Sequence, residues 1–435
     1  MLNDILNILN DSNLFLTGGG GVGKSYTIKE IISHYKSGFK NVVVLGSTGI
    51  SAVGVGGVSC HSFFKFGISE NFEELKLLDK KQKSKLNELK KILKNCDLLI
   101  IDEISMVSAE LMEMISLRLI WSEFRGKVLL VGDFYQLPPV KKSAQNLLFS
   151  FNYAFSSNAW NNLNLKNVEL RVSKRTKDVG FYKILSKIRI GVIDDEICDF
   201  LKSKIVREIP NNITALFGRN YEADRLNEQR LNEINSSLET ILAKTKIYDN
   251  SMHSALLQKW ILNLNSPCEL RLKKGAKVMF LANKWGEYYN GEQGVIREFV
   301  KGEGGVEIIL VQKDSGEVIR VEPHTYELYD YHMKDEELSQ TLKANYMQFP
   351  LKLAYAITIH KSQGMSIEKF ACNVDNIFAN GQLYVALSRA ISADGLYIQY
   401  TKNIDFADYL KKVVKIDNEV SDFYRNSKFI KENIT

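Results

Sequence analysis

A glycine-rich segment near the N-terminus constrains the fold of this chain more than any other feature. The run Gly18-Gly-Gly-Gly-Val-Gly23-Lys24-Ser25 follows the apolar stretch Leu14–Leu16 and precedes a helical pattern that begins at Tyr26. It matches G-x-x-x-x-G-K-[ST] in the strand, loop and helix order that a phosphate-binding loop requires. The glycines let the backbone curl so that successive N–H groups point at one anion beside a helix N-terminus. The sequence therefore predicts a nucleotide-binding P-loop.

The last residues of this loop have separate tasks. Lys24 adds a point charge at the β- and γ-phosphates, and the hydroxyl of Ser25 is placed to ligate Mg²⁺. A glycine-rich loop that binds nothing is the plain alternative, and the strand and helix around the loop argue against it. The predicted nucleotide-binding residues are Gly18, Gly19, Gly20, Gly21, Val22, Gly23, Lys24, Ser25 and Tyr26, of which Ser25 is also a predicted metal ligand.

Two carboxylates follow a second apolar run. Leu98–Ile101 leads directly into Asp102 and Glu103. Beside a P-loop, Asp102 is placed to hold Mg²⁺ and Glu103 to polarise an attacking water. An Asp-Glu pair after a strand is otherwise a loop or a helix cap, and the upstream P-loop favours the catalytic interpretation. The pair indicates hydrolysis by water, and because no Asn-Lys-x-Asp guanine reader occurs, ATP is the predicted nucleotide.

A third apolar run completes this half of the site. Val128–Val131 leads into Gly132–Pro139, where the amide of Gln136 is predicted to contact the γ-phosphate and the Pro138-Pro139 pair restricts the loop. A kinase, a GTPase or a motor can each carry these elements. The residues up to this point predict the site and leave its task open.

Short apolar runs recur through the whole chain with helical stretches between them. Runs of Val, Ile and Leu without alternation are typical of strands buried on both faces of a parallel sheet. The fold class is therefore α/β, and runs before about residue 140 and after about residue 210 indicate two sheets in tandem. The runs are Leu14–Leu16, Val42–Leu45, Leu98–Ile101, Val128–Val131, Ile213–Phe217, Val278–Leu281 and Leu396–Tyr400.

Two segments interrupt this rhythm. Residues 70–95 carry eight lysines in a helical stretch, a pattern that is more often a solvated face than a binding site. Residues 286–335 indicate a small β module, with a turn at Tyr288–Gly291 and strands at Val306–Val311 and Glu317–Val321. The tail after about residue 401 predicts a polar, charged, helical end.

The composition excludes a disordered, collagenous or coiled-coil protein. Of 435 residues, 45% are hydrophobic and 25% charged, as in ordinary globular proteins. The net charge of +6 permits a polyanionic partner without requiring one. No stretch approaches the roughly 18 apolar residues of a membrane span, and the N-terminus lacks the basic flank of a secretory signal, so we expect a cytosolic or nucleoplasmic protein. The five cysteines are far apart and without zinc-site spacing, which indicates reduced packing residues.

Two C-terminal blocks separate the alternatives for the P-loop. The block 348–365 contains His360-Lys361-Ser362-Gln363, and the block 381–390 contains Tyr384 to Arg389. With the P-loop, these blocks resemble motifs V, VI and I of the PIF/RecD-like 5′-to-3′ DNA helicases of superfamily 1B, the PIF branch in particular. The remaining motifs of that family resemble Gly46–Ala52 with Val58–Phe64, Asp102–Met106, Val107–Arg125, Gly132–Val140 and Leu170–Thr176. The resemblance covers nearly the whole chain.

The resemblance implies two tandem RecA-like P-loop domains with ATP in the cleft between them. Residues 1–165 form RecA-like domain 1A, with a small wedge insertion at 65–95 as domain 1B. Residues 166–435 form RecA-like domain 2A, with an SH3-like β insertion at 283–347 as domain 2B. In the family, the arginines at the positions of Arg175 and Arg389 reach the γ-phosphate, so the predicted catalytic residues are Lys24, Asp102, Glu103, Gln136, Arg175 and Arg389. A helix cap or salt bridge is the plain alternative for Arg389.

The resemblance also implies a groove for single-stranded DNA. Hydroxyls and backbone N–H groups position phosphates there, while rings such as Phe63 and Phe134 stack on bases without reading sequence. Core packing is an equal alternative for Phe63, His61 and His360 taken singly. The predicted nucleic-acid-binding residues are Thr48, Gly49, His61, Ser62, Phe63, Phe134, Asn220, His360, Lys361 and Ser362.

The function that the resemblance implies is an ATP-dependent DNA helicase that uses Mg²⁺, moves 5′ to 3′ on single-stranded DNA and unwinds duplex or forked DNA. Such an enzyme serves replication, repair, recombination, or maintenance of telomeres or mobile DNA. Two alternatives stay open: a nucleotide-gated single-stranded DNA binding or loading factor that does not unwind, and an RNA helicase. We expect a monomer in solution, cytoplasmic and nucleoid-associated in a prokaryote or nuclear otherwise, and not secreted.

Overall fold

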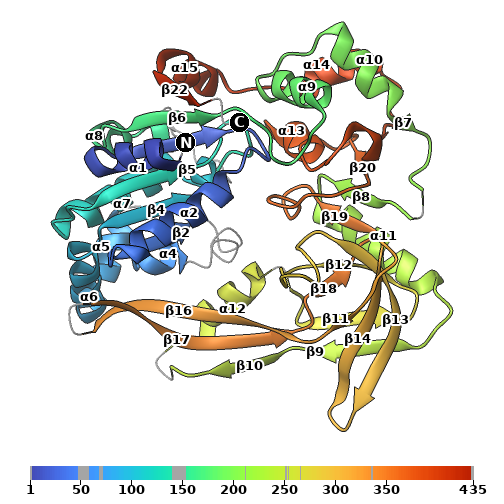
Figure 1. The fold of residues 1–435 in the computed structure, drawn as a ribbon, viewed down its shortest axis with the longest axis horizontal. Helices are drawn as coiled ribbons and strands as arrows, with labels where there is room; N and C mark the ends of the chain where they lie inside the picture. The colour runs from blue at the N-terminus through green and yellow to red at the C-terminus, as the bar shows by residue number, and fades with distance from the viewer. Residues whose placement is uncertain are drawn as a thin grey trace. The chain divides into compact units, whose positions relative to one another are not determined.

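The computed structural model describes residues 2–47, 58–67, 72–139, 153–210, 212–249, 252, 254–264, 266–334 and 337–432. The chain divides into two compact units, whose elements are labelled in Figure 1. The first comprises Met1–Lys174, Leu328–Lys343 and Asp417–Thr435, and the second comprises Arg175–Glu327 and Ala344–Ile416. None of the helices in the described ranges is long and apolar enough to cross a membrane.

A parallel sheet forms the centre of the first unit. Its described strands have the order β22, β6, β1, β5, β4, β2, β3, and neighbouring strands pair in parallel. All five residues of β1, β2 and β4 are buried, which explains why these strands are visible as unbroken apolar runs. The bounds are β1 (Leu14–Gly18), β2 (Val42–Gly46), β3 (Val58–Ser59), β4 (Leu98–Asp102), β5 (Lys127–Val131), β6 (Lys166–Leu170) and β22 (Phe429–Glu432).

Apolar periodicity and capping residues account for the helices of the first unit. Ser108 caps α7 by accepting a hydrogen bond from the backbone N–H of Leu111, and Ser59 caps α4 in the same way from Ser62. Their bounds are α1 (Leu2–Asp11), α2 (Lys24–Ser37), α4 (Cys60–Phe63), α5 (Phe72–Lys81), α6 (Lys83–Lys94), α7 (Ala109–Trp121), α8 (Asn158–Asn162) and α15 (Asn418–Asn426).

The predicted wedge segment contains the helices α5 and α6. One face of α6 is buried through Leu86, Leu89, Ile92 and Leu93, while most of the lysines of both helices are exposed. A two-pronged ion pair of 2.7 Å per contact between Asp79 and Arg118 ties α5 to α7. The lysine-rich stretch is thus a helical pair that packs by its apolar face and presents its charge to solvent.

A second parallel sheet forms the centre of the second unit. Its described strands have the order β19, β8, β20, β21, β7. The strand bounds are β7 (Ile205–Val206), β8 (Thr214–Phe217), β19 (Ala356–Thr358), β20 (Phe370–Asn373) and β21 (Leu396–Gln399). The helices of this unit are α9 (Val179–Arg189), α10 (Asp195–Ser203), α11 (Asn220–Glu233), α12 (Ser254–Asn263), α13 (Gln382–Leu387) and α14 (Phe406–Val413). The prediction of two tandem α/β sheets is confirmed.

Antiparallel strands make up the β module that the sequence predicts. The order β15, β14, β13, β12, β18 has its own core around Val278, Phe280 and Ile309. The run Val278–Leu281 was expected in a parallel sheet, which is wrong, because β12 pairs antiparallel with β13 and β18. The bounds of these strands are β12 (Lys277–Phe280), β13 (Gln293–Gly302), β14 (Gly305–Lys313), β15 (Val318–Val321) and β18 (Leu351–Leu353). Two further sheets have the orders β10, β17, β16 and β11, β9. Their bounds are β9 (Leu238–Leu242), β10 (Lys244–Ile247), β11 (Glu269–Lys273), β16 (His324–Lys334) and β17 (Glu337–Gln348).

The division into units differs from the predicted domain boundaries in three places. The break lies between Lys174 and Arg175 and not near residue 165, because β6 continues the first sheet. The end of the hairpin β16–β17, a long two-stranded ribbon in Figure 1, belongs to the first unit at Leu328–Lys343. The C-terminal segment also joins the first unit, because β22 pairs in parallel with β6. The sequence predicts a polar, charged, helical end there and does not reveal this strand.

Candidate nucleotide site and nucleic-acid interface

The predicted P-loop connects the end of β1 to the start of α2. Its backbone is held at Gly21, whose carbonyl oxygen accepts a hydrogen bond of 2.7 Å from the backbone N–H of Lys174. Gly18 has φ of +144°, and a Cβ atom there would lie 2.4 Å from the carbonyl oxygen of Leu170. Only glycine fits at that contact. Gly23, with φ of +95°, then leads into the first turn of α2.

Lys24 lies across this loop. Its Nζ donates hydrogen bonds to the carbonyl oxygens of Gly18 at 2.7 Å and Gly19 at 3.0 Å. Ser25 and Tyr26 are exposed in the same helical turn. The Lys24 ammonium and the Ser25 hydroxyl therefore lie together at the N-terminus of α2, a 14-residue helix.

The predicted acidic pair lies at the same edge of the sheet. In a parallel sheet the carboxyl ends of strands meet at one edge, and β5 lies between β1 and β4. Asp102 ends β4, is only 8% exposed, and accepts a hydrogen bond of 2.8 Å from the backbone N–H of Glu103. Burial, together with the charge of Glu103, raises the pKa of Asp102 to about 7, while the charge of Lys24 opposes that rise. Glu103 has left-handed backbone with φ of +54°.

Gln136 follows β5 at this edge. Its amide Nε2 donates a hydrogen bond of 3.3 Å to Oδ2 of Asp133, and both side chains are buried. The backbone N–H of Gln136 also bonds to the carbonyl oxygen of Asp133 at 2.9 Å, which closes a tight turn. The side chain predicted to contact the γ-phosphate is therefore held in place by the buried carboxylate of Asp133.

The donor set at this edge fits a nucleoside triphosphate with Mg²⁺. The glycine backbone and Lys24 suit phosphate oxygens, and the hydroxyl of Ser25 and the carboxylate of Asp102 are the oxygen ligands that Mg²⁺ prefers. Within the part of the chain that the structure describes, no group of three or more His, Cys, Asp or Glu side chains forms a metal cage.

The two predicted arginines of the second unit meet at Ser388. Arg175 Nη1 donates to the carbonyl oxygen of Ser388 at 2.6 Å, and Arg389 Nη2 donates to the hydroxyl of Ser388 at 2.8 Å. Burial lowers the pKa of Arg175 to about 10, which leaves it charged at neutral pH. Arg389 is only 2% exposed. Its guanidinium also donates to the carbonyl oxygens of Val385, Ser362 and Met365. These contacts hold the Arg389 guanidinium between α13 and the segment that follows β19.

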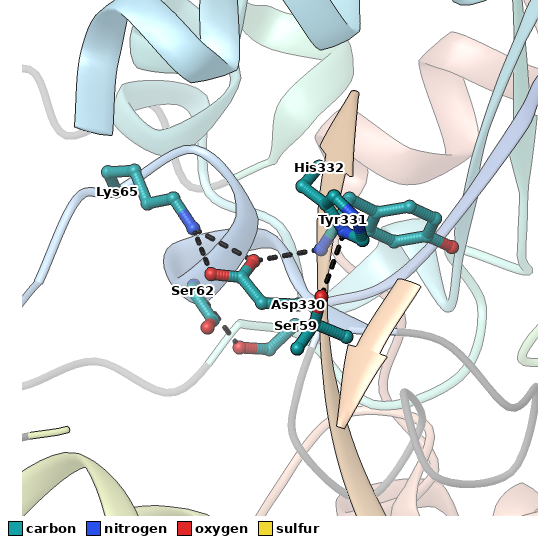
Figure 2. A network of polar contacts seen from close by, with 7 residues as sticks. Ser59, Ser62, Lys65, Asp330, Tyr331 and His332 are labelled. Atoms are coloured by element: carbon teal, nitrogen blue, oxygen red, sulfur yellow. Dashed lines mark hydrogen bonds and ion pairs between the residues drawn. The ribbon is translucent and has the colours of Figure 1, made fainter. Parts of the chain in front are cut away.

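The helix α4 carries three predicted nucleic-acid-binding residues, of which His61 and Ser62 are partly exposed. Figure 2 shows this helix beside the end of β16, where Lys65 forms an ion pair of 2.9 Å with Asp330. Thr48 and Gly49, predicted for the same groove, lie outside the described residues. Asn220 is exposed at the first position of α11, and His360 and Lys361 are partly exposed after β19.

Three of the predicted nucleic-acid-binding residues are buried in this structure. Phe63 is 1% exposed and packs edge-on against Tyr331 with ring centroids 5.6 Å apart. Phe134 is 2% exposed within an aromatic cluster, so neither ring is open to a base. Ser362 is fully buried, and its hydroxyl donates to the carbonyl oxygen of Ile359 at 2.7 Å. Packing partners distant in sequence, which the local pattern does not reveal, cover the two rings, whereas the Ser362 hydroxyl is held by a bond within its own turn.

Comparison with known proteins identifies the family. The family model described as PIF1-like helicase matches residues 2–199. The ATP-dependent DNA helicase Pif1 of Campylobacter jejuni is 44% identical over 439 residues, which cover 99% of this chain and 98% of that protein. This chain belongs to the PIF1-like helicase family.

Solved Pif1 structures share the fold over nearly the whole chain. The crystal structure of Bacteroides sp Pif1 in complex with ADP-AlF4 matches with a TM-score of 0.82 at 28% identity, covering 98% of this chain and 96% of that one. Bacteroides Pif1 bound to ssDNA matches with a TM-score of 0.64 at 29% identity, covering 98% and 96%. The two parallel sheets of this chain are therefore the RecA-like sheets of a PIF1-like helicase.

One aromatic residue lies outside the blocks that indicated a PIF1-like helicase from sequence. Phe378 is 61% exposed, and its ring lies nearly parallel to that of His360, at 19° with centroids 6.4 Å apart. The guanidinium of Arg219, next to Asn220, lies 6.0 Å from the centroid of the Phe378 ring. An exposed ring near an imidazole and a guanidinium is suited to stacking on a base. Its position three residues before Gly381 was the available sequence signal.

Proposed function

We propose that this chain is an ATP-dependent DNA helicase that translocates 5′ to 3′ on single-stranded DNA and unwinds duplex or forked DNA. The observation that carries the proposal is the convergence of Lys24, Asp102 with Glu103, and Gln136 at the carboxyl ends of β1, β4 and β5. Kinship with proteins named ATP-dependent DNA helicase Pif1 supports both the nucleotide and the track. The polarity rests on the family resemblance.

Each residue at this edge has a task in the proposed hydrolysis. Lys24 exchanges its bonds to Gly18 and Gly19 for phosphate oxygens, a small movement because the ammonium already lies over the loop. Ser25 and Asp102 hold Mg²⁺, which when bound neutralises charge on the β- and γ-phosphates. Glu103 accepts the proton of the attacking water. Gln136 orients the terminal phosphate through an amide whose position Asp133 determines.

The remaining assignments extend the same proposal. Arg175 and Arg389 are proposed to sense the γ-phosphate in the closed state of the motor, with Ser388 as their shared contact in this structure. Residues 65–95 correspond to the wedge domain and the module at 283–347 to the SH3-like domain. His61, Ser62, Asn220, His360 and Lys361 are proposed to line the strand, with Phe378 in place of Phe63 and Phe134 as the stacking ring.

A tailed-duplex assay tests the proposal. The protein is mixed with duplexes that carry a 5′ or a 3′ single-stranded tail, with either DNA or RNA as the loading strand. Separation of the 5′-tailed DNA duplex in the presence of ATP and Mg²⁺ is expected. Hydrolysis without separation on either tail would favour the loading factor, and equal separation from an RNA strand would favour the RNA helicase.

Two further properties complete the proposal. We expect a monomer in solution, which light scattering of the purified chain measures directly. We also expect the protein in the cytoplasm with the nucleoid if the source is prokaryotic, and in the nucleus otherwise. Fluorescence imaging of the tagged chain in its own cell checks this location.

A further inference from the structure

The C-terminal segment places a tyrosine hydroxyl next to the proposed ATP site. In Figure 1, α15 and β22 lie beside β6 at the edge of the first sheet, as their parallel pairing requires. Phe423 of α15 joins the aromatic cluster, with its ring stacked 4.4 Å from that of Phe155. The next residue, Tyr424, stacks on Tyr135 with ring centroids 4.4 Å apart. Two neighbouring aromatic residues thus fix α15 against the loop that follows β5.

The hydroxyl of Tyr424 contacts both the end of β1, just before the P-loop, and the turn that follows β5. Its Oη lies 2.7 Å from Oγ1 of Thr17, the residue immediately before Gly18 of the P-loop. It also lies 3.4 Å from Oδ1 of Asp133 and accepts a hydrogen bond of 3.3 Å from the backbone N–H of Phe134. Thr17 and Asp133 are both 0% exposed, so each of these contacts is shielded from solvent.

The donor and acceptor groups around Tyr424 Oη determine the direction of each of these three hydrogen bonds. A carboxylate only accepts, so the single proton of the tyrosine hydroxyl goes to Asp133. The two lone pairs of Tyr424 Oη then accept from the Phe134 N–H and from the Thr17 hydroxyl. All three hydrogen-bonding positions of one side chain are thereby used, and the chain Thr17, Tyr424, Asp133, Gln136 is continuous.

We propose that Tyr424 is a positioning residue that holds the turn at residues 133–136, and with it the Gln136 amide, in register with the P-loop. The inference rests on the proposed ATP hydrolysis and adds a residue from the far end of the chain to it. Because Tyr424 touches Asp133 and Thr17, it acts through the geometry of other groups. Its loss should affect the reacting state more than nucleotide binding.

The variant Tyr424→Phe removes only the hydroxyl and keeps the ring that stacks on Tyr135. We expect kcat for DNA-stimulated ATP hydrolysis to fall about tenfold, with KM for ATP within about twofold of the wild type. The matched control is Tyr153→Phe. Tyr153 is 3% exposed, and its hydroxyl donates a hydrogen bond of 3.4 Å to Oδ2 of Asp417 in the same C-terminal segment. It should leave kcat unchanged.

A double-mutant cycle separates positioning from packing. Thr17→Val approaches the same contact from the P-loop side, and it keeps the proposal testable if Tyr424→Phe folds poorly. If the two residues act through one bond, the double variant should lose no more kcat than the more affected single variant. Losses that multiply would overturn the shared contact.

Hydrogen exchange of the peptide covering residues 133–137 gives a readout that does not depend on hydrolysis. Since Phe134 N–H donates to Tyr424, exchange there should be faster in Tyr424→Phe than in Tyr153→Phe or the wild type. Unchanged exchange, or faster exchange with unchanged kcat, would overturn the positioning role. A wild-type chain that hydrolyses no ATP would reject the proposed function, while the exchange comparison would still decide whether Tyr424 holds this turn.

Discussion

Lys65 Nζ lies 2.9 Å from both carboxylate oxygens of Asp330, although 265 positions separate the two residues in the chain. Figure 2 shows the pair between the turn after α4 and the end of β16. Lys65 has left-handed backbone with φ of +59°, and its carbonyl oxygen accepts a hydrogen bond of 2.7 Å from Gln82. Next to Asp330, Tyr331 is buried against Phe63. The contact fixes the end of the hairpin beside the helix that carries His61 and Ser62.

This ion pair predicts a local loss of stability when one charge is removed. Asp330→Asn should lower the free energy of opening at the end of β16 by about 1 kcal/mol, because the Lys65 side chain is only 14% exposed. Hydrogen exchange of a peptide covering residues 326–334 measures it. The double variant Lys65→Asp with Asp330→Lys should recover part of the loss, since aspartate tolerates left-handed backbone. Glu123→Gln, in an exposed pair with Lys94, is the control and should change little.

Removing the P-loop lysine should abolish ATP hydrolysis and leave the binding of single-stranded DNA intact. Lys24→Ala removes the ammonium that lies over Gly18 and Gly19, so ATP hydrolysis and unwinding should fall by on the order of a hundredfold or more. Binding of single-stranded DNA, measured by fluorescence anisotropy, should stay within a few-fold of the wild type. Lys29→Ala, an exposed lysine on the same helix, is the control. A Lys24 variant that still unwinds duplex DNA would contradict the P-loop assignment.

The exposed ring beside His360 predicts weaker strand binding when it is truncated. Phe378→Ala should raise the Kd for single-stranded DNA about tenfold, because stacking on one base contributes about 1–3 kcal/mol. Phe378→Trp should retain most of the affinity, since it keeps a flat aromatic face. Phe39→Ala removes a ring that is 99% exposed in the first unit and should have no effect. Equal Kd values for Phe378→Ala and the wild type would remove the ring from the interface.

A partly exposed lysine in β18, Lys352, has a buried amine and predicts a pH dependence of stability. Among the described residues, Lys352 Nζ has no hydrogen-bond partner, and burial, aided by the charge of Lys361, lowers the pKa of Lys352 from 10.5 to about 7. Between these values the unfolded chain binds more protons than the folded one. The stability contributed by this group is therefore present above about pH 10.5 and is lost as the pH falls towards 7.

Removing the buried amine tests that sign. Lys352→Met should be more stable than the wild type by about 2 kcal/mol at pH 7, and the gain should shrink towards pH 10.5. Urea unfolding at both values measures the difference. The exposed Lys369→Met should show no such trend. A gain that is equal at both pH values would mean that packing, and not the charge, destabilises the wild-type site.

The elements predicted best are those whose signal is local. The strands β1, β4 and β5 are buried on both faces, so their apolar residues form unbroken runs, and the functional side chains follow directly after them. The glycine spacing of the P-loop reflects a contact with Leu170 that excludes a Cβ atom at Gly18. The position of Lys24, Asp102 and Gln136 at one sheet edge followed from parallel topology alone.

The two buried rings and the one wrong strand pairing concern residues whose surroundings come from distant segments. Phe63 is covered by Tyr331 of the hairpin, and Phe134 by Phe423 of the C-terminal helix. The antiparallel pairing of β12 depends on β13 and β18, and nothing in a four-residue apolar strand distinguishes the two kinds of sheet. Phe378 went unnoticed because exposure, and not residue type, makes a ring available to a base.

The sequence by itself determined the α/β class, the tandem sheets and the order of the phosphate-binding elements, because each is written in residues adjacent in the chain. Only the tertiary structure decided which residues complete the site. Tyr424 lies 407 positions from Thr17, and its role depends on β22 pairing with β6. Strand pairing and side-chain packing bring such residues together in space. A local sequence pattern does not show which distant segments are in contact.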